Sequence, residues 1–327
     1  MAAYTGIQGQ NILIVSSDPA NPTEGQIWYN STTNLLKGYA NVVTNAWASG
    51  GALNTAVRSN AGTGTQTAAL SFGGVLTAII GQTELYNGTS WTTNPTGLNT
   101  ARSGLAGCGT QTSALAFGGL TPGPTVSSST EEYDGTSWTS GGNLATARSN
   151  LAGAGTQAAG LAFGGGPPNT GTTEEYDGTS WTAGGSLNTV RQALAGAGTQ
   201  TAALGFGGYT TVLTGATELY NGTSWTSNPT GLNTARSSLG GAGTQTAALG
   251  FAGYKGGSPV NSGATELWNG TSWTTNPNSM ATVRHNLGEA GTQTAALGFG
   301  GNDGTPGTTA TEEWLGNVLT VRTITTS

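Results

Sequence analysis

RQALAGAGTQTAALGFGGYTTVLTGATELYNGTSWT, residues 191–226, is one of six copies of a unit that the chain repeats. Each copy is anchored by an arginine, and successive anchors lie 44, 46, 43, 45 and 48 residues apart: Arg58, Arg102, Arg148, Arg191, Arg236 and Arg284. A period of about 40–50 residues is typical of the blades of a β-propeller. The repeat therefore predicts an all-β ring built from similar blades.

Each repeat has the pattern of four strands separated by turn residues. The first strand follows the anchor, as in residues 237–243, and GTQ then makes a turn into a TAALGF-like second strand. The third strand is TELYN or TEEYD, and the fourth is TSWT. Asn-Gly or Asp-Gly joins the last two strands and is a strong signal for a type I′ turn. We therefore expect four-stranded blades with such turns at 87–88, 134–135, 177–178, 221–222 and 269–270.

The second strand has two apolar faces of different size. In residues 201–206, Leu204 and Phe206 share one face, and Ala203 and Gly205 share the other. A strand that is apolar on both faces is buried on both. Stacked blades need this arrangement, because the large side chains of one sheet fill the space beside the small face of the next. Gly-Gly ends the strand in five repeats and Ala252-Gly253 in the fifth unit, where glycine permits a positive φ.

The chain carries little charge. Charged residues are 7% of 327, the net charge is −6, and six of the nine Lys and Arg residues are the anchors. Few cations remain to neutralise phosphates, so nucleic acids and anionic membrane surfaces are not expected partners. Cys108, the single cysteine, stands where sister repeats have alanine, so we expect a buried residue and no disulfide. No signal peptide and no apolar run of about 18 residues is visible, so no membrane insertion is expected.

The two ends of the chain are less regular than the repeats. Residues 11–17 alternate as a strand does, and residues 27–30 and 34–40 predict a hairpin around Ser31–Thr33. Trp47 then matches Trp138, so the N-terminal segment joins the repeat in phase at its outer end. At the C-terminus, Arg322 aligns with the anchor of an inner strand. A competing alignment places Leu319 in the tryptophan position of an outer strand.

These ends decide the predicted number of blades. We favour seven blades, in which residues 1–50 form the closing blade and the attachment element, while 51–327 supply the repeats of one propeller with 1–50. The alternative is six blades plus an N-terminal arm.

The order of Arg, Gly-Gly, Glu-x-Tyr/Trp and Trp resembles the kelch repeat of β-propellers, from about Trp47 to Trp314. The resemblance implies kelch-type blades of four strands, with the first strand nearest the axis.

The repeated charged and aromatic residues have a structural interpretation. We expect the arginines and glutamates to form ion pairs within or between blades, the alternative being six binding sites. Glu131-Glu132, Glu174-Glu175 and Glu312-Glu313 point to opposite faces and are expected at a solvated edge. The tryptophans are interpreted as hydrophobic anchors between outer strands, with sugar stacking as the alternative: Trp91, Trp138, Trp181, Trp225 and Trp273.

No residues suited to catalysis stand out from the repeats. His285 is the only histidine, whereas a metal site needs several His, Cys or clustered carboxylate ligands. We therefore expect no catalytic residue, no metal, no cofactor and no enzymatic activity.

The stretch between the second and third strands varies in length and content while its flanks barely change. Loops on a rigid scaffold commonly carry binding, and in repeat proteins one face often collects the insertions. Tolerated drift at exposed tips is the alternative. The candidate ligand-binding residues lie in these loops: Thr121, Pro122, Pro124, Tyr209, Thr210, Tyr254, Lys255, Asn302 and Asp303.

Residues 19–39, PANPTEGQIWYNSTTNLLKGY, resemble an N-terminal element of bacteriophage virion proteins. Gly/Thr/Ala-rich kelch arrays are also familiar from predicted phage proteins. The resemblance implies a non-enzymatic tail-fibre, tail-tip or capsid-surface component of the virion, assembled in the host cytoplasm. Its expected partners are other virion proteins, a host-surface glycan or protein, and further copies of the chain. The alternatives are a secreted or cell-surface carbohydrate-binding adhesin of bacteria and a degenerate propeller enzyme.

Overall fold

The computed structural model describes residues 12–23, 25–42, 45–123, 125–258, 260–316 and 318–324, and among them it contains strands and no helix. The chain divides into two compact units. Unit 1 comprises the described residues of Met1–Asn45 and Leu315–Ser327, and unit 2 comprises those of Ala46–Trp314.

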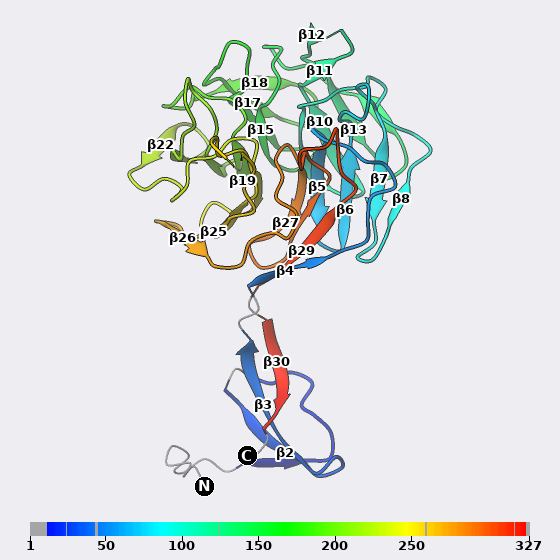
Figure 1. Ribbon diagram of the computed structural model, residues 1–327, viewed down its shortest axis with the longest axis vertical. Coiled ribbons are helices and arrows are strands. Elements are labelled where there is room, and N and C mark those ends of the chain that lie inside the picture. The colour runs from blue at the N-terminus through cyan, green and yellow to red at the C-terminus, as the bar shows by residue number, and fades with distance from the viewer. Residues whose placement is uncertain are drawn as a thin grey trace. The chain divides into compact units, whose positions relative to one another are not determined.

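Unit 2 contains six four-stranded sheets, which Figure 1 shows around a common centre. Written from inner to outer strand, the first three are β5 (Ala61–Thr65), β6 (Ala68–Phe72), β7 (Thr83–Tyr86) and β8 (Trp91–Thr93); β9 (Ala106–Thr110), β10 (Ser113–Phe117), β13 (Thr130–Tyr133) and β14 (Trp138–Ser140); and β15 (Ala152–Gly155), β16 (Gly160–Phe163), β17 (Thr173–Tyr176) and β18 (Trp181–Gly184). The others are β19 (Ala195–Thr199), β20 (Ala202–Phe206), β21 (Thr217–Tyr220) and β22 (Trp225–Asn228); β23 (Gly240–Gly243), β24 (Ala248–Phe251), β25 (Thr265–Trp268) and β26 (Trp273–Asn276); and β27 (Gly288–Gly291), β28 (Ala296–Phe299), β29 (Thr311–Leu315) and β4 (Ala46–Ser49). A short hairpin, β11 (Leu120–Thr121) and β12 (Thr125–Val126), lies between β10 and β13.

The six inner strands follow one another around the centre, and β27 lies beside β5. The residue two positions before each inner strand has a φ between 51° and 57° and belongs to a cycle of backbone hydrogen bonds. Each N–H donates to the carbonyl of the preceding repeat over 2.7–2.9 Å, and Ser59 closes the cycle by donating to Asn286. The members are Ser59, Gly104, Asn150, Ala193, Ser238 and Asn286. The sheets are thus consistent with the blades of a β-propeller.

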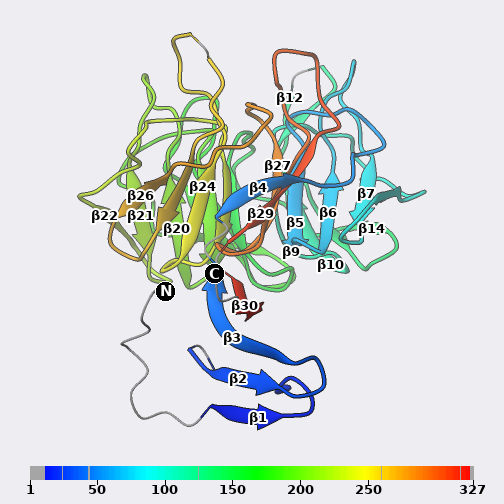
Figure 2. The ribbon, with the colours of Figure 1, turned by 60° about the horizontal axis from the view of Figure 1, so that its bottom comes forward.

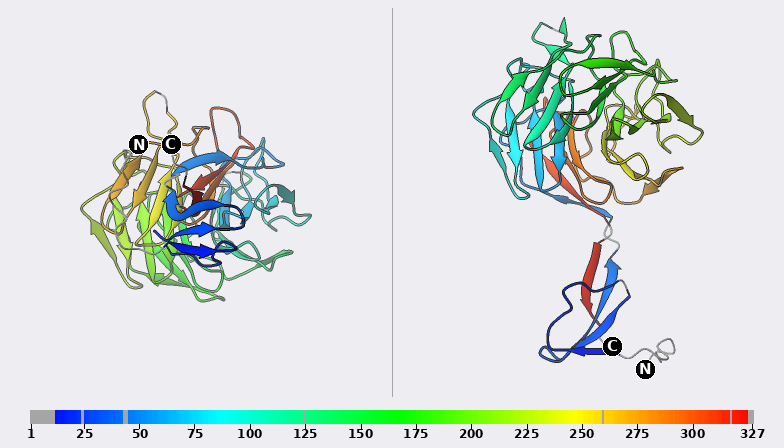
Figure 3. Two further views of the ribbon diagram at one scale, coloured as in Figure 1. Left: turned by 90° about the horizontal axis from the view of Figure 1, so that it is seen from below. Right: turned by 180° about the vertical axis from the view of Figure 1, so that it is seen from behind.

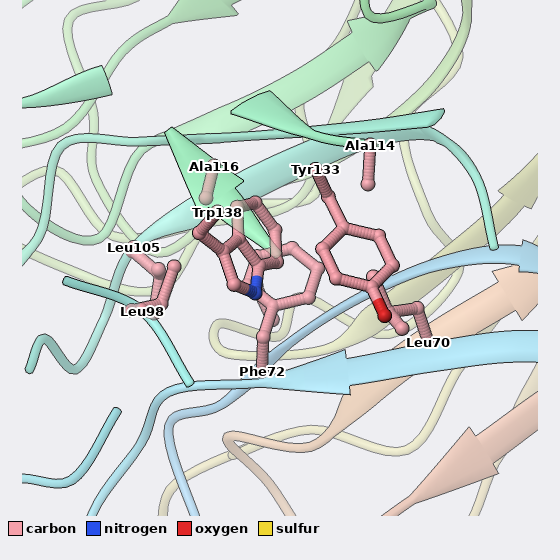
Figure 4. Packing of buried hydrophobic residues seen from close by; sticks show 9 residues of the cluster. Leu70, Phe72, Leu98, Leu105, Ala114, Ala116, Tyr133 and Trp138 are labelled. Carbon is pink, nitrogen blue, oxygen red and sulfur yellow. The ribbon is translucent and has the colours of Figure 1, made fainter. Parts of the chain in front are cut away.

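Neighbouring sheets pack as the two-faced second strand predicts. Phe72 of β6 meets Trp138 of the next sheet with ring centroids 4.9 Å apart, and Leu70 and Phe72 lie in one cluster with Ala114 and Ala116 (Figure 4). The large face of one sheet therefore covers the small face of its neighbour. The same contact joins the last sheet to the first, through Phe299 and Trp91 at 4.8 Å.

Two sets of side chains add polar links between the sheets. The indole N–H of each outer-strand tryptophan donates to a threonine of the preceding sheet, as from Trp225 to Thr173 over 2.9 Å. The glutamine of each GTQ turn donates to two carbonyls of the preceding sheet. Gln245, for example, bonds Ala203 O and Tyr220 O at 3.0 and 2.5 Å. Both sets also link the first sheet back to the last, through Trp91 to Thr311 and Gln66 to Trp314.

The predicted type I′ turns are wrong. A type I′ turn needs a positive φ at both central residues, yet in the Asn87-Gly88 turn only Gly88 has one. The loop instead spans four residues, and Asn87 N donates to Ser90 O over 3.1 Å. The Asn87 side-chain oxygen accepts from the N–H groups of Thr89 and Ser90. A carboxylate does the same at Asp134, which explains why Asn and Asp alternate at this position.

The Gly-Gly pairs hold the positive φ expected of them. Gly73 and Gly74 have φ values of 67° and 108°, and a Cβ on Gly73 would lie 2.6 Å from Arg102 O. Ala252 takes the same conformation with φ 59°.

The tryptophan alignment of the N-terminal segment is confirmed, because Trp47 on β4 donates to Thr265 as the other outer-strand tryptophans do. The seventh blade is not confirmed. Among the described residues up to Gly50, β4 is the one strand that enters unit 2, where it is the outer strand of the sheet formed by β27, β28 and β29. The C-terminal strand β30 (Val318–Thr323) belongs to unit 1, where it pairs with β3, so neither proposed alignment of Arg322 or Leu319 places it in a blade.

Unit 1 is a four-stranded sheet in the order β1 (Leu13–Val15), β2 (Ile27–Asn30), β3 (Leu35–Val42) and β30 (Figure 3). The predicted hairpin is confirmed by β2, β3 and the turn at 31–34, whereas β1 pairs with β2 in parallel. Asp18 holds this sheet together: it accepts from Trp28 Nε1 and Asn30 Nδ2 and pairs with Lys37 at 2.6 Å. These bonds, with Lys37 the strongest, lower the pKa of Asp18 to about 2.

Candidate functional site

The variable loops of unit 2 leave the same end of their sheets, which we call the loop face. Figure 2 shows the described residues of the segments 120–123, 125–126, 254–258, 260–263 and 302–308 projecting from one side of unit 2. The first residue of each loop bridges to the residue after the arginine position, as Tyr209 does to Gln192 and Tyr254 to Ser237. The GTQ turns and the Asn-Gly turns lie at the opposite end, because the strands of each sheet are antiparallel.

The predicted ligand-binding residues within the described chain all lie on the loop face. Tyr209 and Tyr254 are 40% and 37% exposed, which is high for such large rings. Pro122 and Lys255 are also exposed, whereas Thr121, Thr210, Asn302 and Asp303 are half-buried. Pro124 lies outside the described residues. The variable loops also carry exposed aliphatic side chains at Leu76, Val212 and Val260.

Neighbouring loops are tied to one another by hydrogen bonds. Asn169 Nδ2 donates to Tyr209 O over 3.1 Å, and Asn261 Nδ2 donates to Asn302 O over the same distance. Arg58 Nη1 donates to Pro306 O. These bonds link three neighbouring pairs around the loop face: the third loop with the fourth, the fifth with the sixth, and the sixth with the first repeat.

His285 lies on this face within a group of polar and aromatic side chains. Its Nδ1 is 2.8 Å from Asn261 Oδ1, and its ring stands edge-on to Tyr254 with centroids 5.8 Å apart. Burial and the nearby charge of Arg58 both lower the pKa of His285. Among the described residues, no three His, Cys, Asp or Glu side chains gather in a group suited to a metal ion.

Five of the six repeated arginines form buried ion pairs within their own sheets, with N–O distances of 2.8–3.2 Å. The pairs are Arg102–Glu131, Arg148–Glu174, Arg191–Glu218, Arg236–Glu266 and Arg284–Glu312. Desolvation lowers the pKa of each of these arginines, and the paired glutamate opposes that shift. Since both partners are buried, these groups brace the sheets and offer no surface to a ligand.

Arg58 does not occupy the arginine position, which corrects the alignment of the first repeat. Val57 takes that place: its carbonyl accepts from Gly301 N, as Arg102 O accepts from Gly74 N. Arg58 instead bridges to Val75, as Ser103 does to Leu120.

The first sheet compensates for the missing guanidinium with an amide. Glu84, 3% exposed, accepts from Gln82 Nε2 over 3.0 Å and from the N–H groups of Asn54 and Thr55. A cavity of about 10 Å³ remains beside Val57, which is room for roughly one water.

The adjacent carboxylates do point to opposite faces, but the first of each pair is buried instead of lying at a solvated edge, and the second is half-buried. Glu131 is 2% exposed in its ion pair, and Glu132 accepts the hydroxyl of Tyr176 from the next sheet. Tyr176 itself is buried, and its hydroxyl is the donor of this hydrogen bond. The five outer-strand tryptophans predicted as anchors are likewise at most 9% exposed, so their rings face neighbouring sheets rather than solvent.

An axial channel runs between the six inner strands, and glycine is the commonest residue in its wall. Two cavities of about 90 and 130 Å³ occupy it. Both have Glu289 in their walls, together with glycines of the inner strands that include Gly62, Gly107, Gly153 and Gly196. Glu289 stands where the other inner strands have glycine; its side chain is half-buried, and partial desolvation raises its pKa. The aligned sequence contains this difference, but its position beside the axis is visible only in the structure.

No family of known proteins matches the chain, and no curated protein is detectably similar to it in sequence. The resemblance to the kelch repeat therefore rests on the repeated residues alone. No helix long and apolar enough to cross a membrane occurs within the described residues.

Proposed function

We propose that the protein is a non-enzymatic structural component of a bacteriophage particle, and that its loop face binds a ligand on the host surface. The observation that carries the proposal is the contrast between the two ends of the sheets. The loop face gathers the length variation, both exposed tyrosines and the cross-linked loops, while the opposite turns repeat with little change. The phage-like stretch at residues 19–39 supports assignment to a virion.

The scaffold of this proposal is a six-bladed, kelch-like propeller. The closed cycle of backbone hydrogen bonds from Ser59 to Asn286 and the packing of Phe299 on Trp91 support six blades. Kelch-like character is supported by the structural place of each repeated residue: the arginine in an ion pair, Gly-Gly at positive φ and the tryptophan between sheets.

Unit 1 is the proposed attachment element. Its edge strand β1 exposes Leu13 and Ile14, which are 49% and 70% accessible, next to Ile12 at 42%. An exposed apolar edge strand is a template for pairing with another chain. A neighbouring virion protein is the partner that fits an attachment role.

The loop face is tested by comparing two pairs of variants. Tyr209→Ser with Tyr254→Ser changes the exposed rings, whereas Thr112→Ala with Thr201→Ala changes exposed turn residues at the opposite end. We expect the first pair to lower binding of the purified protein to host cells by at least tenfold and the second to leave it unchanged. Equal binding by both pairs would remove the loop face from the proposal.

The virion assignment has a separate test. Mass spectrometry of purified particles is expected to detect the protein in fixed stoichiometry with the other virion proteins. Absence from particles, together with loop-dependent binding to cells, would instead indicate the bacterial adhesin.

A further inference from the structure

We propose that the loop face binds a sugar that carries a carboxylate, such as a hexuronic acid of a surface glycan, and that Tyr254, His285 and Arg58 form the site. The inference rests on the proposed function, because it names the class of ligand and the sector of the loop face that receives it. The three residues belong to the fifth, sixth and first repeats. These repeats are consecutive around unit 2, since the inner strands β27 and β5 lie side by side.

The sixth variable loop, residues 302–308, joins His285 to Arg58. At the start of the loop, Asn302 N donates to His285 O over 2.8 Å and His285 N donates to Asn302 O over 3.1 Å. Toward its end, Pro306 O accepts from Arg58 Nη1. Burial and then the charge of Arg58 lower the pKa of His285, which agrees with this proximity. The imidazole and the guanidinium therefore belong to one continuous surface.

Asn261 fixes the orientation of the imidazole. This side chain is 7% exposed, its Nδ2 donates to Asn302 O over 3.1 Å, and its Oδ1 lies 2.8 Å from His285 Nδ1. Because the amide oxygen can only accept, Nδ1 is the ring nitrogen that carries the proton. Nε2 of the neutral ring is then an acceptor, and it has no hydrogen-bond partner among the described residues. It is available to a sugar hydroxyl.

Tyr254 supplies the apolar surface of the site. Its ring is 37% exposed and stands edge-on to His285, with ring centroids 5.8 Å apart. A tyrosine ring is a rigid contact area that is apolar on its faces and polar at its tip. The C–H face of a sugar ring can pack against it beside the imidazole.

The cations of unit 2 that are not in buried ion pairs lie in this sector. Unit 2 has seven Lys and Arg residues, and five of them form those pairs. The other two are Arg58 and Lys255, the exposed neighbour of Tyr254. Asp303 is the one acid of the described variable loops, and it accepts from Thr305 N and Oγ1 over 3.0 and 2.6 Å. The sector thus keeps one net positive charge on a chain of net charge −6.

This sector differs from the other repeats at one position. The residue after the arginine position is serine or glutamine in the second to fifth repeats, but it is Arg58 in the first and His285 in the sixth. Tyr209 begins the fourth loop as Tyr254 begins the fifth. The repeat that follows Tyr209 has Ser237 at the position of His285. Tyr209 is therefore a matched control for Tyr254.

One net positive charge suits a ligand with an isolated carboxylate. A guanidinium has further N–H donors beyond the one bound to Pro306 O, and it binds carboxylates through pairs of such donors. An acidic peptide brings several carboxylates, and the described residues of the sector contain no further Lys or Arg to match them. A sugar acid instead combines one carboxylate with hydroxyl groups for Nε2 and an apolar face for Tyr254.

The experiment follows the imidazole resonances of the full chain by NMR, because the chain has a single histidine. Methyl β-D-glucuronoside is titrated at constant pH and ionic strength, with methyl β-D-glucoside as its uncharged match. We expect a saturable shift with the glucuronoside and at least about tenfold weaker binding of the glucoside, which lacks the charge-assisted bonds. Arg58→Gln and Tyr254→Ser should each weaken glucuronoside binding by about tenfold or more, whereas Tyr209→Ser should leave it unchanged.

Four results would overturn the proposal. The first is the absence of any saturable shift with the glucuronoside. The second is equal binding of the two glycosides by the unaltered protein, a comparison that does not depend on how a variant folds. The third is glucuronoside binding that survives in both Arg58→Gln and Tyr254→Ser. The fourth is tighter binding of inorganic phosphate or of a glutamate-rich peptide than of the glucuronoside.

The same measurements separate this inference from the proposed function. Loss of cell binding in the Tyr209 and Tyr254 pair, without any glucuronoside binding, would retain the loop face as a binding surface and remove the acidic sugar. Glucuronoside binding by a protein that is absent from purified particles would retain the sugar site and remove the virion assignment.

Discussion

The first repeat contains a natural replacement for the buried ion pair, and this replacement can be transferred to another repeat. Arg236 is fully buried and donates to Glu266 over 2.9 Å and to the carbonyls of Ala252 and Ala264. Arg236→Val copies Val57 and leaves Glu266, 1% exposed, without its cation. Loss of one partner of a buried pair costs about 3–5 kcal/mol. We expect the free energy of unfolding to fall by that amount.

Ala264 occupies the place of Gln82. The carbonyl of Gln82 accepts from Gly73 N, and the carbonyl of Ala264 accepts from Ala252 N, in each case the first residue after the second strand. Adding Ala264→Gln to Arg236→Val supplies an amide like the one that donates to Glu84 over 3.0 Å. A hydrogen bond to a charged group contributes about 1.5–3 kcal/mol. We therefore expect the double variant to recover roughly half of the loss.

The assay is urea unfolding of the full chain followed by tryptophan fluorescence, with Ala264→Gln alone as the control. In that control Arg236 already occupies the carboxylate, so no gain is expected. A loss below about 1 kcal/mol in Arg236→Val, or no recovery in the double variant, would refute the proposed role of the ion pair and of Gln82.

Three further measurements test individual contacts. Gln245→Ala removes two bonds between neighbouring sheets and should lower the free energy of unfolding by about 1–3 kcal/mol relative to Thr201→Ala in the adjacent turn, measured by urea unfolding. In unit 1, the pKa of Asp18 is lowered to about 2 from its ordinary value near 3.8. The contribution of Asp18 to stability is therefore present above pH 4 and is lost as pH falls toward 2. The Trp28 indole N–H resonance should report this loss, and Asp18→Asn should abolish the pH dependence. Cys108 is buried with a pKa raised to about 12, so a thiol reagent at pH 8 should modify it only after the chain is unfolded, and rapid labelling of the folded protein would contradict its placement.

The repeat was predictable from sequence because its strongest constraint is local. Alternation of Leu204 and Phe206 with Ala203 and Gly205 determines both faces of the strand, and the structure buries both. Trp47 was placed correctly for the same reason, since its ring must fill a position that every outer strand shares.

The predictions were wrong where one residue type fits two local structures. Arg58 follows Val57 by one residue, and a repeated arginine alone cannot show which of two neighbouring positions points into the sheet. Asn-Gly suits both a type I′ turn and a four-residue loop in which the Asn87 side chain accepts two N–H groups. Only the backbone path distinguishes these possibilities.

Long-range pairing explains the remaining differences. Residues 1–50 contain strands, but their sequence does not show that β30 would pair with β3 or that β4 would complete a sheet begun 239 residues later at Gly288. The location of the candidate site on one face of the repeats was predictable, because the variation of the loops is visible in the sequence. The place of Glu289 in the channel wall and the bonds of Asp18 were not, because both depend on residues that come together only after folding.

The completion of one sheet by β4 has a mechanical consequence. The chain enters unit 2 through β4 and leaves it through β29, and these strands are neighbours in a single sheet. A pulling force transmitted along the flanking segments is therefore applied to one sheet, while the other five bear load only through their neighbours. Resistance of the ring to tension then depends on a four-residue strand and on the bond from Trp47 to Thr265. Detachment of that strand is therefore the first step expected when the chain is pulled, and the load then passes to β5 of the first sheet.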